Sequence, residues 1–443
     1  MISVNRWTRL VWGVCCLVWG QVLWAAPQID DWYTHNGARV LFVNAPELPM
    51  VDVRVVFDAG SARDGNTAGL AEMTNTLLND GAGAWDADQI AARLESVGAK
   101  LGFGAARDMA WVTLRTLTDP EAYDRAVGTL AVVLGQPTFE QDDLERNRKA
   151  MQTALRVGEQ EPGTVAEKAY FHALYRDHPY AIPSDGTSAS LEAITREQVV
   201  AFYRQYYVAK NARVAIIGAL DRPQAEALAE RVVGELPSGE SAPGLPPVPK
   251  LQQGIEIHTP FPSSQSHILM GQPGMHRGDP DYFPLYVGNH ILGGSGLVSQ
   301  LSQEVREKRG LSYSVYSYFS PMRRSGPFII GAQTKNSQVD EAVAVIQQTL
   351  QRYLDNGPTE QELIAAKQNI SGGFPLRIAS NSKIVEYLAM IAFYDLPLDF
   401  LETFVTKVEA VTREQIHQAF KRRLDPDGFV VVTVGNAKAA PDS

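Results

Sequence analysis

The sequence has almost no cysteine, and this scarcity excludes several kinds of site at once. Its two cysteines, Cys15 and Cys16, lie next to each other near the start of the chain. The rest of the chain therefore has no disulfide framework, no cysteine-based zinc site and no thiol nucleophile. Positive charge is also scarce, because 40 lysines and arginines face 50 acidic residues and the formal net charge is −10. We therefore expect no nucleic acid as a partner.

Long apolar runs are missing too, apart from a short one near the start. The apolar run 10–24 follows two arginines and precedes Ala25 and Ala26. This layout is typical of a secretory signal peptide, and the run is shorter than the ~20 residues that a membrane-spanning helix needs. We predict a signal peptide over residues 1–25, export to the periplasm or beyond, and no stable membrane span after cleavage. An uncleaved membrane anchor is the alternative.

Histidine pairs with the spacing of metal ligands are absent as well. No two histidines stand four residues apart, the spacing that places both imidazoles on one face of a helix. The sequence therefore excludes a zinc-binding histidine pair on one helix. The eight histidines are His35, His172, His178, His258, His267, His276, His290 and His417.

The second half of the chain repeats landmarks of the first half. The tetrapeptide Thr-Arg-Glu-Gln at 195–198 precedes a helical pattern and an apolar strand-like run, and it recurs 217 residues later at 412–415. A Pro-Thr pair that opens a long helical pattern occurs at 137–138 and again 221 residues later at 358–359. Because the order and the offset are both nearly kept, the sequence predicts two homologous domains.

A segment rich in proline and glycine separates the two predicted domains. Residues 236–250 read LPSGESAPGLPPVPK, a composition that excludes a helix and favours an extended linker. We therefore predict an N-terminal domain over 26–235 and a C-terminal domain over 251–443. In each domain, strand-like runs in adjacent pairs alternate with long amphipathic segments, which favours an α+β fold with a mainly antiparallel sheet covered by helices.

One stretch of the second predicted domain, residues 293–318, combines several unusual features. It opens with Gly-Gly-Ser-Gly, continues as a short amphipathic segment that ends at Gly310, and then alternates like a strand. Arg306 and Tyr313 stand seven residues apart across this turn. A guanidinium offers fixed donors to a peptide carbonyl, and a phenol can donate to an oxygen on which charge develops. The alternative is a solvated helix end and an ordinary strand residue.

These landmarks resemble the pitrilysin/insulinase family of zinc peptidases, and within it the two-domain members related to mitochondrial processing peptidase. The resemblance rests on the duplicated layout, on His178-Pro179-Tyr180, and on LGGSG…LSQEVREKRGLSYSVYS over 292–317. It implies two homologous domains that face each other like a clam shell. It also implies that an arginine and a tyrosine seven residues apart, the places of Arg306 and Tyr313, bind the substrate near the scissile peptide.

The resemblance further implies a zinc site in the first domain, made by an inverted His-x-x-Glu-His motif and a downstream glutamate. Here the matching positions hold Glu72 and Thr76 in place of the histidines and Asn75 in place of the glutamate. The downstream ligand would fall near Thr153 or Ala154, neither of which can replace a carboxylate. We therefore predict that this chain binds no metal and has no catalytic residue of its own.

This one-sided loss leads to a functional hypothesis. The chain would be a non-catalytic, substrate-binding subunit of a heterodimeric periplasmic zinc metallopeptidase. A homologous partner subunit would hold the zinc, and this chain would contribute Arg306 and Tyr313 toward a peptide or unfolded polypeptide. Whether the chain is part of an enzyme stays open at this point. The alternative is a non-proteolytic peptide-binding or structural protein of the cell envelope.

Overall fold

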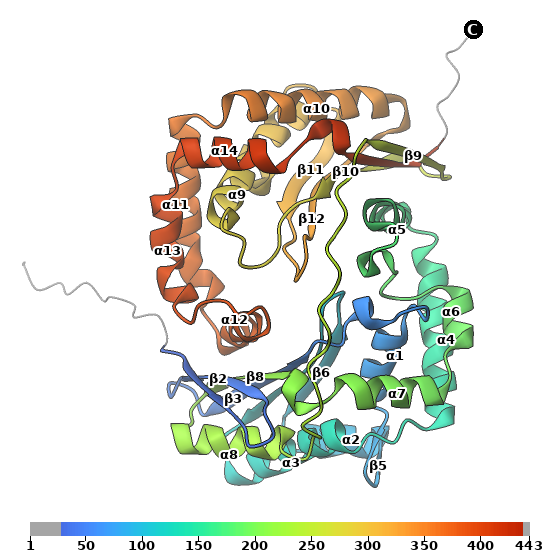
Figure 1. The fold of residues 1–443 in the computed structure, drawn as a ribbon, viewed down its shortest axis with the longest axis vertical. Helices are drawn as coiled ribbons and strands as arrows, with labels where there is room; N and C mark the ends of the chain where they lie inside the picture. The colour runs from blue at the N-terminus through green and yellow to red at the C-terminus, as the bar shows by residue number, and fades with distance from the viewer. Residues whose placement is uncertain (1–27, 437–443) are drawn as a thin grey trace, which may run out of the picture.

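The computed structural model describes residues 28–436, which form two halves of similar construction (Figure 1). The strands of the first half are β1 (Asp30–Tyr33), β2 (Arg39–Asn44), β3 (Met50–Phe57), β4 (Gly81–Ala82), β5 (Trp85–Asp86), β6 (Lys100–Ala105), β7 (Ala110–Leu117) and β8 (Ala212–Gly218). Its α-helices are α1 (Leu70–Leu77), α2 (Ala87–Glu95), α3 (Pro120–Gly135), α4 (Gln141–Gly158), α5 (Pro162–Tyr175), α6 (Ser188–Ala193), α7 (Arg196–Tyr206) and α8 (Arg222–Val233).

The second half follows a connection over 234–254 that contains no helix or strand. Its strands are β9 (Ile255–Pro260), β10 (Gln265–Pro273), β11 (Ser312–Phe319), β12 (Pro327–Lys335) and β13 (Val430–Gly435). Its α-helices are α9 (Tyr282–Asn289), α10 (Val339–Asn356), α11 (Glu360–Arg377), α12 (Asn381–Phe393), α13 (Phe400–Ala410) and α14 (Arg413–Arg423). One short helical turn matters below, namely η6 (Ser302–Glu307).

Each half is built on one large sheet, and the two sheets have corresponding strand orders. The first runs β1-β2-β8-β3-β7-β6 and the second, read in the same direction, runs β9-β13-β10-β12-β11. One pair in each sheet is parallel, β2 with β8 and β9 with β13, and the other neighbours are antiparallel. The predicted α+β fold of two helix-covered, mainly antiparallel sheets is confirmed. The predicted domain bounds at residues 235 and 251 remain predictions.

The repeated tetrapeptides begin α7 and α14 in the same way. Thr195 and Thr412 each accept a hydrogen bond from the backbone N–H three residues later, and the glutamine there accepts one in return. Such a capping box satisfies two donors that a helix start leaves free. In both halves the next arginine reaches back to the Pro-Thr landmark, since Arg196 donates to the carbonyl of Thr138 and Arg413 donates to that of Pro358.

Each sheet is covered on one face by a helix that comes from the other half. Helix α5 of the first half packs on β10 and β13, and α12 of the second half packs on β3 and β8. Figure 1 shows α12 beside the first sheet and α5 beside the second. One hydrophobic cluster therefore joins Val56 and Ile217 to Leu388, and another joins Tyr170 to Val432. The two halves share their cores.

A buried carboxylate adds a polar tie between the halves. Asp108, in the turn between β6 and β7, is 4% exposed. It accepts hydrogen bonds from the Tyr180 hydroxyl at 2.5 Å, from the Tyr394 hydroxyl at 2.9 Å and from the backbone N–H of Arg323 at 2.7 Å. Tyr180 belongs to the first half, whereas Tyr394 and Arg323 belong to the second. Donors from both halves therefore compensate the desolvation of one charge.

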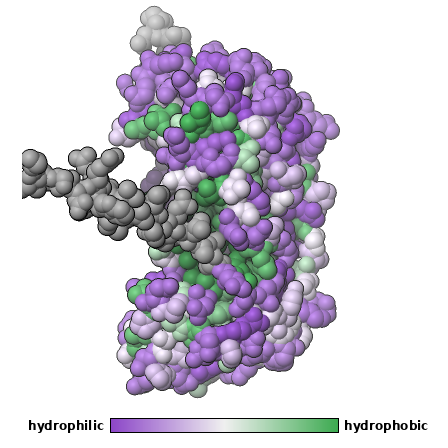
Figure 2. Space-filling model, turned by 90° about the vertical axis from the view of Figure 1, so that its left-hand side faces the viewer, coloured by the Kyte–Doolittle hydropathy of each residue, from purple (hydrophilic) through white to green (hydrophobic). Residues whose placement is uncertain are grey.

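The face on the side of α11 and α13 is mostly hydrophilic (Figure 2). Seen from the side of α11 and α13, hydrophobic residues gather in separate patches within a hydrophilic surround (Figure 2). No helix within residues 28–436 is long and apolar enough to cross a membrane. The predicted signal peptide over residues 1–25 lies outside the described residues.

Candidate functional site

The positions of the degenerate zinc motif lie on α1, and their side chains serve packing. Asn75 is 1% exposed, and its amide donates to the Tyr207 hydroxyl at 3.2 Å and to the carbonyl of Trp111 at 3.4 Å. Glu72 is partly buried, and burial together with the charge of Asp185 raises its pKa. Thr76 is partly buried and offers only a hydroxyl. The carboxyl of Glu72 is the one suitable ligand among these three side chains, since the Asn75 amide is already hydrogen-bonded. A single carboxyl does not make a zinc site.

The downstream position fits a metal no better. Thr153 and Ala154 are exposed on α4, and the Thr153 hydroxyl donates to the carbonyl of Lys149 at 2.8 Å. Within residues 28–436, no group of three or more histidine, cysteine, aspartate or glutamate side chains could hold a metal ion. The residues of this chain therefore do not fit the zinc that the family resemblance implies.

Arg306 and Tyr313 are brought into contact on the second half. Arg306 lies in η6 and Tyr313 in β11, and the guanidinium carbon is 5.1 Å from the centroid of the phenol ring. Such a cation–π contact at an exposed site contributes about 0.5–1 kcal/mol. Tyr313 is 81% exposed, the largest exposed fraction among the exposed large hydrophobic side chains of the described chain. Both polar groups are therefore open to a ligand.

The backbone between the two residues explains why they meet. Gly310 takes a left-handed conformation with φ +62°, and its N–H donates to the carbonyl of Arg306 at 2.9 Å. The pairing of β11 with β12 shifts by one residue between Ser312 and Ser314. Tyr313 is the extra residue in this β-bulge, and a bulge re-aims the side chain that it carries.

Neighbouring charges are engaged elsewhere and leave Arg306 for this contact. Glu304 accepts from Lys308 at 2.7 Å and from Arg309 at 2.6 Å, and Arg352 lies 3.2 Å from it. The hydrogen bonds from Lys308 and Arg309 lower the pKa of Glu304 to about 2. Arg306 has only a long contact with Glu307, at 3.5 Å. Lys308 and Arg309 thus belong to a cluster around Glu304, whereas Arg306 faces Tyr313.

The glycine-rich segment before Arg306 packs closely at its start and is open at its end. A Cβ on Gly293 would lie 2.3 Å from the hydroxyl of Ser317, whereas Gly296 has φ +62° and free space around it. The two residues that follow, Leu297 and Val298, are 58% and 72% exposed. The segment that precedes Arg306 in the sequence therefore exposes two apolar side chains.

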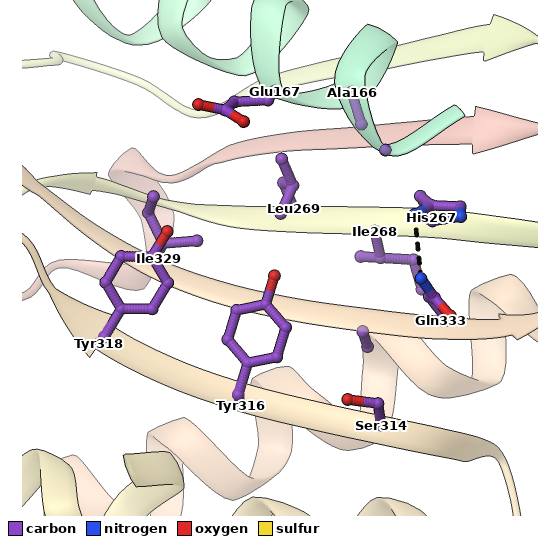
Figure 3. A pocket seen from close by; sticks show the side chains of 12 residues that line it. Ala166, Glu167, His267, Ile268, Leu269, Ser314, Tyr316, Tyr318, Ile329 and Gln333 are labelled. Carbon is purple, nitrogen blue, oxygen red and sulfur yellow. Dashed lines mark hydrogen bonds between the residues drawn. The ribbon is translucent and has the colours of Figure 1, made fainter. Parts of the chain in front are cut away.

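A small cavity between α5 and the second sheet is a site that the sequence did not reveal. It has a volume of about 130 Å³, and Glu167, His267, Tyr316 and Tyr318 are among its lining residues (Figure 3). The rings of Tyr316 and Tyr318 stack with centroids 5.9 Å apart. The alternation in the sequence of β11 could have indicated that these tyrosines share a face. Glu167 could not be found in this way, because it comes from the other half.

The fold and the degenerate motif place the chain within a peptidase family. The profile described as Insulinase (Peptidase family M16) matches residues 39–188, and the profile described as Peptidase M16 inactive domain matches residues 193–370. The chain belongs to the M16 insulinase family. Together the two matches extend from residue 39 to residue 370 and include parts of both halves of the described fold.

Similar proteins differ in what their names say about activity. A crystal structure of a peptidase M16 inactive domain from Pseudomonas fluorescens is 41% identical, with a TM-score of 0.90, and the match covers 93% of this chain and 98% of that one. An uncharacterized zinc protease YmxG of Bacillus subtilis is 25% identical, over 80% of this chain and 86% of the relative. A non-peptidase homolog YmxG of Helicobacter pylori is 26% identical, over 88% of this chain and 90% of the relative.

A structure described as the periplasmic protease PqqL from Escherichia coli shares the fold. It is 15% identical with a TM-score of 0.78, and the match covers 93% of this chain but 46% of that one. At this identity the likeness shows the fold alone. This chain is thus an M16-family homolog of zinc proteases, and one of the similar proteins is named a non-peptidase homolog.

Proposed function

We propose that this chain is a non-catalytic, substrate-binding subunit of a heterodimeric zinc metallopeptidase. The observation that carries the proposal is the contrast between the two halves. Arg306, which is partly buried, lies against Tyr313, which is exposed, whereas Glu72, Asn75 and Thr76 offer no metal site. A homologous partner with an intact zinc motif would hold the metal and the catalytic base.

In this arrangement the chain's own residues bind and orient the peptide. The guanidinium of Arg306 offers several donors in a fixed plane and can hold a carbonyl oxygen of the substrate. The hydroxyl of Tyr313 can donate to the oxygen of the scissile carbonyl, where negative charge develops. The cation–π contact places the guanidinium carbon of Arg306 5.1 Å from the centroid of the Tyr313 ring, so the guanidinium and the phenol would both act on one peptide.

We place this activity in the periplasm. The predicted signal peptide supports export, and a protein of the same fold is described as a periplasmic protease. The partner in this proposal is a homologous subunit, and the substrate is a peptide or an unfolded polypeptide. The predicted N-terminal domain 26–235, linker 236–250 and C-terminal domain 251–443 would then form one of the two subunits around the substrate.

Co-expression with a homologous subunit that has an intact motif tests the proposal. We expect the pair to cleave peptides and a metal chelator to abolish the cleavage. Arg306→Ala or Tyr313→Phe in this chain should lower kcat by about 10²-fold, the cost of removing one oriented donor at a developing charge. If the complex forms and both variants cleave at the wild-type rate, the assigned role is wrong.

The second candidate is a non-proteolytic peptide-binding or structural protein of the cell envelope. The Helicobacter pylori relative named as a non-peptidase homolog favours it. Both candidates expect the purified chain alone to show no zinc and no cleavage. They differ in one result, because only the first expects a zinc-bearing homolog to restore cleavage that a chelator abolishes.

A further inference from the structure

Helix α8 covers the face of the first sheet opposite to α12 (Figure 1). It packs on α3 and on β2, and its Leu228 shares one hydrophobic cluster with Val40 and Phe42 of β2. On the other face of the strand, Leu41 belongs to the cluster that contains Leu388 of α12. The first sheet is therefore buried on both faces where β2 lies.

The second half has a groove at the place that corresponds to α8. Helix α10 follows β12 as α3 follows β7, and β9 and β13 pair in parallel as β2 and β8 do. Between α10 and these two strands lies a groove of about 730 Å³, which we call the α10 groove. No helix of residues 28–436 fills it. Its apolar lining includes Val339, Val343, Ala344 and Val431.

The strand registers show how the corresponding positions differ. Counted back from the last pair of each parallel register, Glu256 of β9 takes the position of Val40, and His258 takes that of Phe42. Val40 and Phe42 are buried in the cluster with α8, whereas Glu256 and His258 are exposed. The α10 groove therefore combines apolar side chains from α10 and Val431 with polar side chains along β9. An apolar centre and a polar rim are typical of interfaces whose partners also exist apart.

The carboxylates of the α10 groove favour a partner with positive charge. Glu256 and Asp340 line the groove, and its lining within the described part of the chain includes no lysine or arginine. In the first half, α8 itself brings a cation to an acidic strand. The guanidinium of Arg222 lies 3.7 Å from the Asp30 carboxylate, and its carbon lies 3.8 Å from the centroid of the Trp32 ring. A basic side chain on a helix in the α10 groove would meet opposite charge in the same way, which orients docking.

We propose that the α10 groove docks an amphipathic helix of a partner protein. The helix packs small apolar side chains against Val343, Ala344 and Val431, and it carries a lysine or arginine opposite Glu256. The duplicated fold indicates this kind of occupant, because α8 fills the corresponding place in the first half. The groove faces away from α5, since Val432, the next residue of β13, belongs to the cluster with α5 instead. The inference therefore does not rest on the proposed peptidase role.

Binding of labelled helical peptides to the isolated chain tests the inference. The lysine peptide, of about 16 residues, repeats the apolar face of α8 with lysine at its polar positions. A glutamate peptide has glutamate at those positions, and a scrambled peptide keeps the composition of the lysine peptide without an apolar face. By fluorescence anisotropy we expect the lysine peptide to bind about tenfold more tightly than either of the others. The scrambled peptide shows how much binding comes from the negative net charge of the chain alone.

Two variants locate the binding in the α10 groove. Ala344→Arg places a large cation among the apolar lining residues and should weaken the lysine peptide to the level of its scrambled form. Glu256→Lys should remove the preference for the lysine peptide over the glutamate peptide. Glu95→Lys changes an exposed carboxylate on α2 of the first half and should leave all affinities unchanged. Thermal unfolding of each variant shows that the comparison is made on folded protein.

Equal binding of the lysine peptide and its scrambled form to the wild-type chain would overturn the inference. This comparison uses only the wild-type chain, so a folding defect cannot hide its result. A charge preference that survives Glu256→Lys would overturn it as well.

Other occupants of the groove would also contradict the inference. Binding that appears only after residues 437–443 are deleted would assign the groove to the chain's own end. Dimerisation of the wild-type chain that Ala344→Arg abolishes would assign it to a second copy. The assay needs no zinc-bearing subunit and reads no cleavage, so its result is independent of the heterodimer proposal.

Discussion

Single polar residues on and just before α1 make hydrogen bonds inside the first half of the chain. Asn75 uses its amide for two hydrogen bonds inside the first half. Just before the helix, Asp64 is 4% exposed and accepts from the N–H groups of Gly69 at 2.8 Å and Ala71 at 2.8 Å. Asp64 thus fixes the start of α1, since free N–H groups at a helix start need acceptors.

Asp64 makes the stability of the fold depend on pH. Burial raises its pKa to about 7 although the two N–H groups oppose the shift, whereas an unfolded aspartate titrates near pH ~4. Between these values the folded chain keeps a proton that the unfolded chain has released, so the free energy of unfolding falls as pH rises through this window. We expect Asp64→Asn to flatten that fall.

Urea unfolding at several pH values between about 4 and 7 measures this difference. The relevant quantity is the slope of the free energy of unfolding with pH for the wild type minus that for Asp64→Asn, because all other groups cancel. Asparagine has nearly the shape of aspartate and keeps one of its two acceptor oxygens, so the variant should fold. Identical slopes would show that Asp64 does not titrate in this range.

Among the helices and strands, the turn from η6 into β11 carries the candidate site. Its geometry depends on two local devices, the left-handed Gly310 and the bulge at Tyr313. A one-residue bulge turns a side chain that would alternate with its neighbours toward a different direction. The seven-residue spacing seen in the sequence produces a contact only because both devices are present.

Two glycines in open surroundings should respond to alanine with opposite signs. An added Cβ meets nothing within 4 Å at Gly310 or at Gly372, but Gly310 has φ +62° and Gly372 lies inside α11. Gly310→Ala should lower the free energy of unfolding by about 1 kcal/mol, because an alanine resists the left-handed conformation. Gly372→Ala should raise it by about 0.5–1 kcal/mol, because alanine favours a helix.

Chemical denaturation of the two variants beside the wild type measures both changes. Since neither position offers a steric clash, each serves as the other's control for the loss of glycine itself. Changes of the same sign would mean that backbone conformation does not govern these positions. If Gly310→Ala also lowers cleavage by the proposed heterodimer, the turn positions Arg306 and Tyr313 as the structure indicates.

For the complete chain, the exchange of α5 and α12 is the feature with the widest consequences. Each sheet needs a helix from the other half to cover its apolar face, and Asp108 accepts hydrogen bonds from both halves. Because buried apolar area is the main stabilising term, neither half keeps a complete core alone. The two halves should therefore unfold in one transition.

Dividing the chain in the connection between the halves tests this. Residues 28–250 expressed alone lack α12 and leave the apolar face around Leu41, Val56 and Ile217 uncovered. We expect this fragment to aggregate or to bind a hydrophobic dye, and co-expression with residues 251–436 to restore a soluble complex. A fragment that is soluble, folded and cooperative by itself would contradict the shared core.

Much of the architecture could be predicted from local pattern. Alternating and helical periodicities placed the paired strands and the covering helices, and the recurring landmarks indicated two copies of one unit. The candidate site was predicted as two residues, Arg306 and Tyr313, whose contact the structure shows. The cavity at Glu167 was missed, because its lining joins residues far apart in the sequence, and a single sequence carries no signal for such a pairing.

The sequence by itself determined the repeat, the missing zinc ligands and the spacing of the arginine and the tyrosine, because each of these is a local property of residue type and order. Only the tertiary structure decided that each sheet takes its cover from the opposite half. It also decided that Glu167 of α5 lines one cavity with Tyr316 and Tyr318 of the other half. The physical reason is that a hydrophobic face requires a partner without specifying which segment supplies it.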